Sequence, residues 1–200
     1  QSEPGYSWAL NLKGTLYESF GEYEKALQFC LQAHKLSIEI VDRETEAETC
    51  SQLGLIYTRL SDFSKALEYY MEGLKIRDEL KDENAMASSL NRIGMIKRLT
   101  GKYDESLEYY FKSLAIRRRN KQASSIPWTL LGIASTYEEM HNTSEALEYY
   151  EQGMVGGDRR CTLQCIMGSG RIFSLSGKTG KAEERLGESL RMAQDLKALS

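Results

Sequence analysis

The stretch SKALEYYMEGLKIRDEL, residues 64–80, contains a tetrapeptide that decides the fold. The four residues Leu-Glu-Tyr-Tyr begin at Leu67, Leu107 and Leu147, so the interval from each copy to the next is 40 residues. A fixed interval of this size indicates a repeat array, in which each unit packs on its neighbours instead of around one globular core. The length of the chain therefore does not give the number of domains until the repeat unit is defined.

Five copies align on two small residues that stand twelve positions apart. The pairs are Gly14 and Ala26, Gly54 and Ala66, Gly94 and Ser106, Ala134 and Ala146, and Gly170 and Ala182. A turn signal separates the two residues of each pair: Gly21, Ser61-Asp62, Gly101, His141-Asn142 and Gly177. Apolar residues on both sides of these turns recur at three and four positions, which is the period of an α-helix. Each copy therefore predicts two antiparallel helices joined by a tight turn.

Local signals predict where several helices begin. Thr45 with Glu48, and Asn142 with Glu145, fit the capping box, in which a side chain at the helix start and one three residues later satisfy free backbone donors. Pro127 suits a first helical turn, where its missing N–H costs nothing. These signals agree with helix starts in the second and fourth copies.

The second helix of the fourth copy carries three glycines, Gly153, Gly156 and Gly157. Each glycine inside a helix costs roughly 0.5–1 kcal/mol relative to alanine. This sequence predicts a short or bent helix, and a weak joint between residues 150 and 162.

At these positions the chain resembles the tetratricopeptide repeat (TPR) family. The family pattern is matched at Leu53-Gly54, Tyr57, Phe63, Ala66 and Tyr70, and at Ile93-Gly94, Tyr103, Ser106 and Tyr110. The resemblance covers about residues 7–197 and implies an all-α fold, a right-handed superhelical TPR solenoid of about five helix-turn-helix repeats. The interval of 40 residues exceeds the 34 of the common repeat and is similar to the long-repeat subgroup that includes kinesin light chains and bacterial signalling proteins.

The expected organisation is a single TPR array over residues 1–200, belonging to a longer protein. The approximate repeats are 7–41, 47–81, 87–121, 127–160 and 163–197.

Composition excludes several classes of partner. The net charge of −3 provides no general attraction for nucleic acid or anionic lipid, and no apolar run reaches the length of a membrane span. The one basic cluster, residues 117–121, is interpreted as a solvated helix end, where cations offset the helix dipole. Four cysteines in a large helical array are expected to be free buried thiols, which favours a reducing, cytoplasmic compartment.

No pattern of catalytic or cofactor-binding residues is found. Residues 168–179 superficially resemble a phosphate-binding loop, but Ile172 occupies a position that requires glycine, and Gly177-Lys178 aligns with the helix-helix turn at Gly101-Lys102. We therefore expect a non-enzymatic protein without a cofactor.

A metal site is not expected either. Cys161 and Cys165 share a helix face, but the two histidines, His34 and His141, belong to other copies. His34 occupies the position of Leu74 in the next copy and is interpreted as a packed or half-exposed histidine.

The family resemblance implies a binding groove lined by the first helix of each repeat. The peptide-groove residues are then Asn11, Thr15, Glu18, Gln52, Arg59, Asn91, Arg92, Met95, Arg98, Trp128, Glu138 and Arg171. The same stripe includes Leu131, Ser135, Gln164, Met167 and Ser174. Within it, Arg59, Asn91, Arg92 and Arg98 are the candidate anion-accepting group, the alternative being that they only solubilise the groove.

The primary hypothesis is a protein- or peptide-binding scaffold with a preformed groove. The alternative is a sensor or dimerisation region of a larger bacterial signalling or regulatory protein. This alternative rests on the last predicted helix of the chain, which carries Leu186, Leu190, Ala193, Leu196 and Leu199. A terminal repeat normally presents a polar outer face, so this apolar stripe makes a homo-oligomer through the C-terminal repeat the second option.

Overall fold

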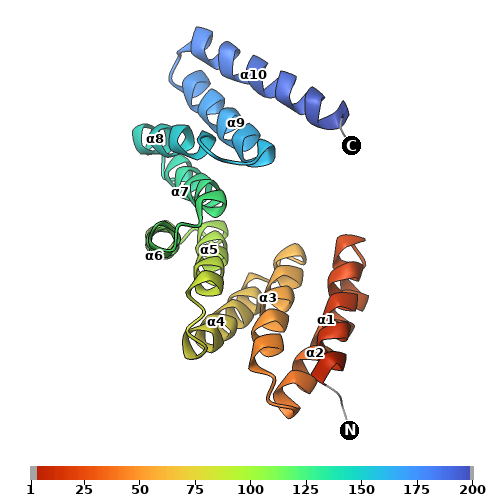
Figure 1. The fold of residues 1–200 in the computed structure, drawn as a ribbon. Coiled ribbons are helices and arrows are strands. Elements are labelled where there is room, and N and C mark those ends of the chain that lie inside the picture. Colours follow the sequence, from red (N-terminus) through yellow and green to blue (C-terminus); the bar gives the residue numbers. More distant parts are fainter. Residues whose placement is uncertain (1–3, 199–200) are drawn as a thin grey trace. The chain divides into compact units, whose positions relative to one another are not determined.

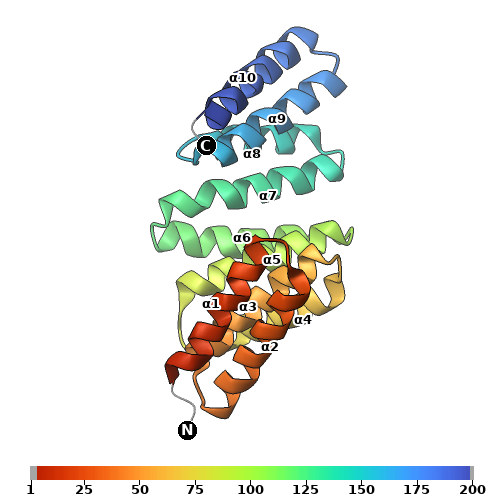
Figure 2. The ribbon, with the colours of Figure 1, turned by 90° about the vertical axis from the view of Figure 1, so that its right-hand side faces the viewer.

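The computed structural model describes residues 4–198 and shows an all-α chain, with no strand in that range. The helices are α1 (Pro4–Ser19), α2 (Tyr23–Glu39), α3 (Arg43–Arg59), α4 (Phe63–Glu79), α5 (Glu83–Leu99), α6 (Tyr103–Arg119), a 3₁₀ turn (Ala123–Ser125), α7 (Ile126–Glu139), α8 (Thr143–Met154), α9 (Arg159–Leu175) and α10 (Thr179–Ala198). Consecutive helices form antiparallel hairpins, as α9 and α10 show in Figures 1 and 2. The predicted fold class is confirmed.

The chain divides into two compact units, which are described separately. The first unit ends at Ile96 and contains α1 to α4 and most of α5, with α1 packed on α2 and on α3. The second unit begins at Lys97 and contains the last residues of α5 and helices α6 to α10, with α7 packed on α8 and on α9. Within each unit, adjacent first helices therefore lie close enough to share a surface.

The predicted turn residues adopt the left-handed backbone conformation that ends a helix. Gly21, Gly101 and Gly177 have φ between 69° and 76°, and Ser61 and His141 occupy the equivalent turns with φ of 61° and 62°. Glycine takes this conformation at no steric cost, whereas a residue with a Cβ is strained there by roughly 1–2 kcal/mol. The turns are therefore set by position in the repeat, even where glycine is missing.

Small residues allow the helices of a hairpin to approach closely. A Cβ built on Gly54 of α3 would lie 2.5 Å from the ring of Tyr70 on α4, and a Cβ on Gly14 would lie 2.3 Å from the sulfur of Cys30. Ala66, twelve residues after Gly54, is fully buried. The small residues that recur in the sequence are therefore a packing requirement.

Aspartates, not the predicted Thr45, cap several helices. The Asp42 side chain accepts a hydrogen bond from the backbone N–H of Thr45 at 3.1 Å, so α3 begins two residues before Thr45 and the predicted capping box there is wrong. Asp42 precedes Thr45 by three residues, which is the spacing from a cap to its donor. Asn142 does precede α8, but its side chain makes no capping hydrogen bond. Pro127 lies in the first turn of α7, as predicted.

The glycine-bearing helix of the fourth repeat is short. Helix α8 has 12 residues, whereas α4 and α6 each have 17. The chain leaves α8 through an extended Val155 and a left-handed Gly156 with φ of 73°. The predicted shortening of this helix is confirmed.

All four cysteines are buried and free, as predicted. Across the described residues, no helix combines the length and apolar character needed to cross a membrane.

Candidate functional site

Helices α7 and α9, which are the first helices of the fourth and fifth repeats, form a pocket of about 200 Å³ in the second unit. It is lined by Leu131, Ser135, Tyr150, Gln164, Met167 and Arg171. All of these except Tyr150 belong to the stripe that the sequence predicts. Tyr150 reaches the pocket from the second helix α8, where its side chain is otherwise buried.

A polar cluster closes one side of this pocket. Arg171 donates from Nε to Glu138 Oε1 at 2.9 Å and from a terminal nitrogen to Oε2 at 2.8 Å, so the pair is bidentate and joins α9 to α7. The hydroxyl of Tyr150 donates to the same carboxylate and lies 3.3 Å from the Ser135 hydroxyl. Bidentate arginine-carboxylate pairs hold a fixed geometry, so the wall of the pocket is preorganised.

The electrostatics of the cluster follow from these contacts. Burial acts to raise the pKa of Glu138, but the hydrogen bonds from Arg171 and Tyr150 outweigh it and the pKa is lowered. Burial, followed by the hydrogen bond to Glu138, raises the pKa of Tyr150. At neutral pH the cluster therefore holds a carboxylate, a guanidinium and a neutral phenol.

Trp128 lies at the other end of the α7 stripe and is half-buried. Its indole nitrogen donates to Asp158 Oδ2 at 3.1 Å, and its ring packs against the core of the fourth and fifth repeats. The predicted groove residue Trp128 is thus hydrogen-bonded to the residue that precedes α9.

In the first unit, the predicted residues of α1 are partly withdrawn from the surface. Asn11 is buried, and its side-chain oxygen lies 3.9 Å from the sulfur of Cys30. The Thr15 hydroxyl donates to the Asn11 carbonyl oxygen at 3.0 Å. Glu18 pairs with Arg59 of α3, whose Nε donates to Oε1 at 3.3 Å. Of these residues, Arg59 is the most exposed and Asn11 offers the least to a ligand.

Two of the predicted groove residues have side-chain amides whose oxygen atoms lack a hydrogen-bond donor among the described residues. The side-chain oxygens of Gln52 on α3 and Asn91 on α5 are buried and have no hydrogen-bond partner among the described residues. Arg92, next to Asn91, lies with its guanidinium 5.8 Å from the centre of the Tyr70 ring. Met95, one turn further along, is half-buried.

The candidate anion-accepting group is largely neutralised within the protein. Arg59 pairs with Glu18 in the first unit, and Arg98 pairs with Glu139 in the second unit. Arg98 is also hydrogen-bonded to Tyr110. The Arg59–Glu18, Arg98–Glu139 and Arg171–Glu138 pairs each join the first helices of adjacent repeats. Arg59, Arg98 and Arg171 therefore each pair with a glutamate of a neighbouring repeat.

Sequence reasoning missed two arginines on second helices that contact the first helix of the next repeat. Arg117 is buried and donates to the Ser125 carbonyl and to the Thr129 hydroxyl, both at 2.6 Å, so its interpretation as part of a solvated helix end is wrong. Arg77 makes the equivalent contact with the Ser89 hydroxyl. The 40-residue interval between the two arginines, and between their partners, is the signal that could have found them.

The comparisons agree with this architecture. The model of the family described as tetratricopeptide repeat matches residues 5–79 and 85–154. A search of curated proteins gave no significant match. The fold resembles that of BtubC (BKLC) from P. vanneervenii, with a TM-score of 0.81 and 20% identity, covering 94% of this chain and 80% of that one.

Two further solved structures share the fold at low sequence identity. The nearly identical TPR-like repeats of a Podosopora anserina putative kinesin light chain give a TM-score of 0.78 at 14% identity, covering 98% of this chain and 99% of that one. A Rap protein complexed with Competence and Sporulation Factor gives a TM-score of 0.85 at 13% identity, covering 98% of this chain and 56% of that one. The family model matches well over half of the residues of this chain, so the chain belongs to the tetratricopeptide repeat family.

Proposed function

We propose that this protein is a non-enzymatic interaction scaffold that binds an extended segment of a partner protein along its first helices. The observation that carries the proposal is the pocket between α7 and α9, which is lined by five residues of one predicted stripe. A concave site with apolar walls and a few fixed polar groups is the usual form of a ligand site. A Rap protein of the same fold was solved in complex with Competence and Sporulation Factor, which supports a role in recognition.

The pocket favours a peptide with an apolar anchor side chain. Leu131 and Met167 supply apolar contacts, and methionine adapts to side chains of different shape. Arg171 and Gln164 can bond to carbonyl oxygens of the bound backbone. An acidic peptide is not required, because the carboxylate of Glu138 already balances the charge of Arg171.

A matched pair of methionines tests the site. Peptides selected from a random library for binding to the wild-type protein are titrated against Met167→Glu and Met71→Glu. The two side chains are 42% and 43% exposed, but Met167 lines the pocket on α9 and Met71 lies on the second helix α4. We expect at least tenfold weaker binding for Met167→Glu and unchanged binding for Met71→Glu. Equal effects of the two changes would contradict the proposed site.

A double charge reversal, Arg92→Glu with Arg98→Glu, tests the basic group. Because Arg98 is already paired with Glu139, we expect a small effect on binding of neutral peptides. A large loss restricted to acidic peptides would restore the anion-accepting role.

The alternative, a dimerisation or sensor region of a larger bacterial signalling protein, is favoured by one observation. Leu186 and Leu190 on α10 are exposed, at 42% and 61%, and Ala193 is also exposed. The side chain of Leu196, and Leu199 altogether, lie outside the described residues. Light scattering that shows a dimer in the wild type and a monomer in Leu190→Glu would support this role. A monomeric wild type at high concentration excludes dimerisation through this stripe.

A cytoplasmic location fits the four free buried thiols.

A further inference from the structure

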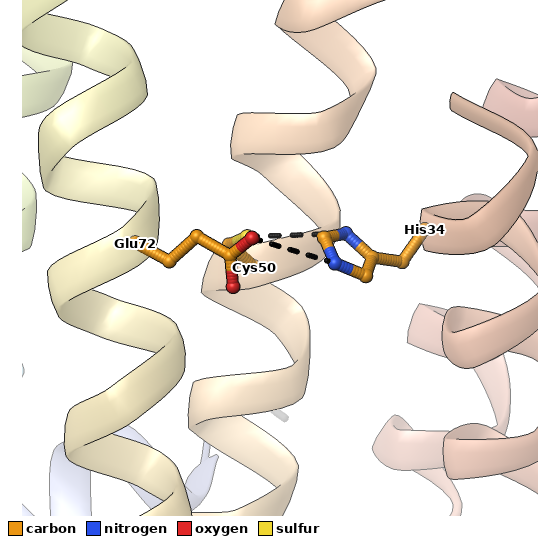
Figure 3. A group of neighbouring side chains, drawn as sticks. All are labelled: His34, Cys50 and Glu72. Atoms are coloured by element: carbon orange, nitrogen blue, oxygen red, sulfur yellow. Dashed lines mark hydrogen bonds and ion pairs between the residues drawn. The ribbon is translucent and has the colours of Figure 1, made fainter. Parts of the chain in front are cut away.

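A histidine, a cysteine and a glutamate from three successive helices meet inside the first unit. They are His34 on α2, Cys50 on α3 and Glu72 on α4 (Figure 3). One potential ligand atom from each lies within 4.8 Å of the other two. His34 Nε2 is 3.7 Å from Glu72 Oε1, and the Cys50 sulfur is 3.9 Å from His34 Nδ1.

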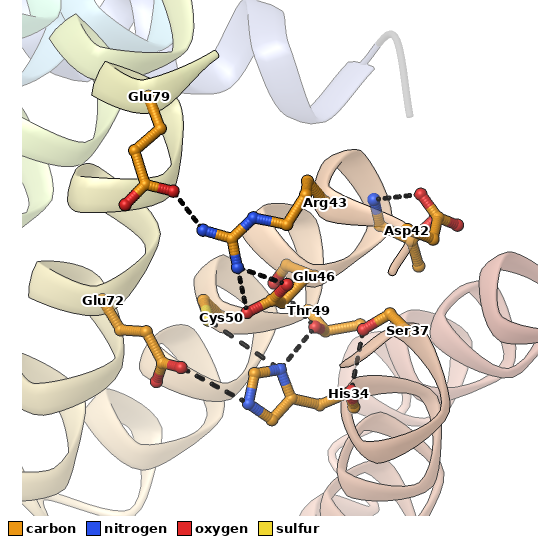
Figure 4. Close-up of polar contacts among 10 residues, drawn as sticks. His34, Ser37, Asp42, Arg43, Glu46, Thr49, Cys50, Glu72 and Glu79 are labelled. Carbon is orange, nitrogen blue, oxygen red and sulfur yellow. Dashed lines mark hydrogen bonds and ion pairs between the residues drawn. The ribbon is translucent and has the colours of Figure 1, made fainter. Parts of the chain in front are cut away.

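The hydrogen bonds around His34 fix its tautomer. The hydroxyl of Thr49 donates its single hydrogen to the carbonyl oxygen of Glu46 at 2.8 Å. The same hydroxyl lies 3.0 Å from His34 Nδ1, so at that contact it accepts and Nδ1 carries the hydrogen (Figure 4). In its neutral form, an imidazole with the hydrogen on Nδ1 presents the lone pair of Nε2 to the Glu72 carboxylate. Their separation of 3.7 Å is longer than a hydrogen bond.

The Glu72 carboxylate accepts a hydrogen bond from the Cys50 thiol. Arg43 is the arginine of this region in Figure 4, and its guanidinium is bound to Glu46 and Glu79. Two electron-pair donors and a thiol therefore lie within 4.8 Å of one another, and a cation that displaces the thiol proton can be held by all three groups.

We propose that His34, Cys50 and Glu72 bind a divalent zinc-class cation. Imidazole nitrogen, thiolate and carboxylate are all ligands of Zn²⁺, and three protein ligands with a water molecule complete a tetrahedral site. Coordination replaces the thiol proton of Cys50, which passes to solvent. Zn²⁺ is then balanced by one thiolate and one carboxylate, so the occupied site is neutral.

The geometry is close to what Zn²⁺ requires. Bonds of about 2.0–2.3 Å in a tetrahedron place ligand atoms roughly 3.3–3.8 Å apart. The His34–Glu72 separation already falls in this range, and the remaining separations need a contraction of up to about 1 Å. Glu72 is half-exposed, so water reaches the fourth position. Thr49 holds the second nitrogen of His34, as is usual for a histidine that binds a metal.

The repeat shows that packing does not require these residues. His34 stands where Leu74 and Leu114 stand in the next two repeats. Cys50 stands where Leu90 and Leu130 stand. Both positions therefore accept leucine elsewhere in the chain, and the two departures from leucine occur side by side in space.

Zinc titration of the metal-free protein in a thiol-free reductant tests the site. We expect one Zn²⁺ per chain and a rise in melting temperature, because the ion binds only the folded state. His34→Leu and Cys50→Leu install the residues of the neighbouring repeats, so they are expected to fold. Each should weaken zinc binding at least about tenfold and abolish the rise in melting temperature. Co²⁺ in place of Zn²⁺ should give a sulfur-to-metal charge-transfer band that Cys50→Ser lacks.

Control variants separate this site from the other thiols. Cys161→Ser with Cys165→Ser removes the one pair of cysteines that are close in the sequence, and His141→Gln removes the other histidine. All three changes should leave zinc binding intact. Zinc binding that survives in folded His34→Leu, or that disappears in the Cys161→Ser with Cys165→Ser variant, overturns the proposal. The absence of one-to-one binding to the wild type also overturns it, leaving His34 as a hydrogen-bonded core residue. None of these outcomes bears on peptide binding at α7 and α9.

Discussion

Arg171 donates two hydrogen bonds, of 2.9 and 2.8 Å, to the carboxylate of Glu138 and so links the first helices of two adjacent repeats. Tyr150 donates to the same carboxylate from a second helix. The contact therefore involves three helices and forms part of the pocket wall. Its chemistry predicts how stability depends on pH.

The contribution of Glu138 to stability should be lost in acid. Its pKa is lowered in the folded state, against the burial that opposes ionisation, by the hydrogen bonds from Arg171 and Tyr150. A lowered folded pKa gives stability that is present above the ordinary glutamate pKa and is lost as pH falls through the folded value. The difference in free energy of unfolding between wild type and Glu138→Gln should therefore be largest near neutral pH and shrink below about pH 4.5.

Urea unfolding of both proteins between pH 3 and pH 7 measures this difference. Arg171→Gln serves as the comparison, because it removes the first of the two favourable hydrogen-bond partners. Its own pH dependence should be weaker than that of the wild type. Parallel pH profiles of wild type and Glu138→Gln would contradict the assignment.

Tyr70 and Tyr150 provide a matched test of a buried hydroxyl. They occupy the same position in their repeats and are equally buried, but the Tyr70 hydroxyl has no hydrogen-bond partner among the residues that the structure describes, and the Tyr150 hydroxyl donates to Glu138. Removing a hydroxyl that bonds to a carboxylate should cost about 1–2 kcal/mol, whereas removing an unpaired buried hydroxyl should be neutral or stabilising. Chemical denaturation of Tyr150→Phe and Tyr70→Phe measures both. Equal costs would show that ring packing alone determines the effect.

Close helix approach at Gly54 should be intolerant of a single methyl group. A Cβ there would lie 2.5 Å from the buried ring of Tyr70, so Gly54→Ala should destabilise by about 1–3 kcal/mol. A Cβ built on Gly187 of α10 has no described atom within 4 Å beyond its own stretch of helix, so Gly187→Ala should stabilise by roughly 0.5–1 kcal/mol through helix propensity. Thermal unfolding of the two variants should therefore shift in opposite directions. A stabilised Gly54→Ala would refute the packing role assigned to this glycine.

The repeat predicts most of the fold because its signals are local. Small residues, turn positions and helical spacing recur in each copy, so a weak signal such as Ser61 is supported by Gly21 and Gly101 at the same position. Helix starts were harder to predict, since the Asp42 cap lies before the apolar pattern begins. The pocket stripe could also be placed, because the family resemblance implies which positions line the groove and these positions fall on one helix face.

The partners of the charged residues could not be predicted. Which carboxylate meets Arg59 or Arg171 depends on how far one repeat is displaced along the next, and the sequence does not give that displacement. The cluster of His34, Cys50 and Glu72 was missed for the same reason. His34 and Cys50 are 16 residues apart, far from the short ligand spacings by which metal sites are recognised in a sequence.

The end of α8 should be the most labile point of the second unit. This helix has five residues fewer than α4, and the chain leaves it through Val155, which is 78% exposed, and the left-handed Gly156. Short helices with few buried apolar contacts open locally at low free energy, and opening sets the rate of amide exchange. Hydrogen exchange followed by mass spectrometry should therefore show faster exchange for residues 150–162 than for the C-terminal half of α4, which has the equivalent place in its repeat. If the two segments exchange equally slowly, the glycines shorten the helix without weakening the joint.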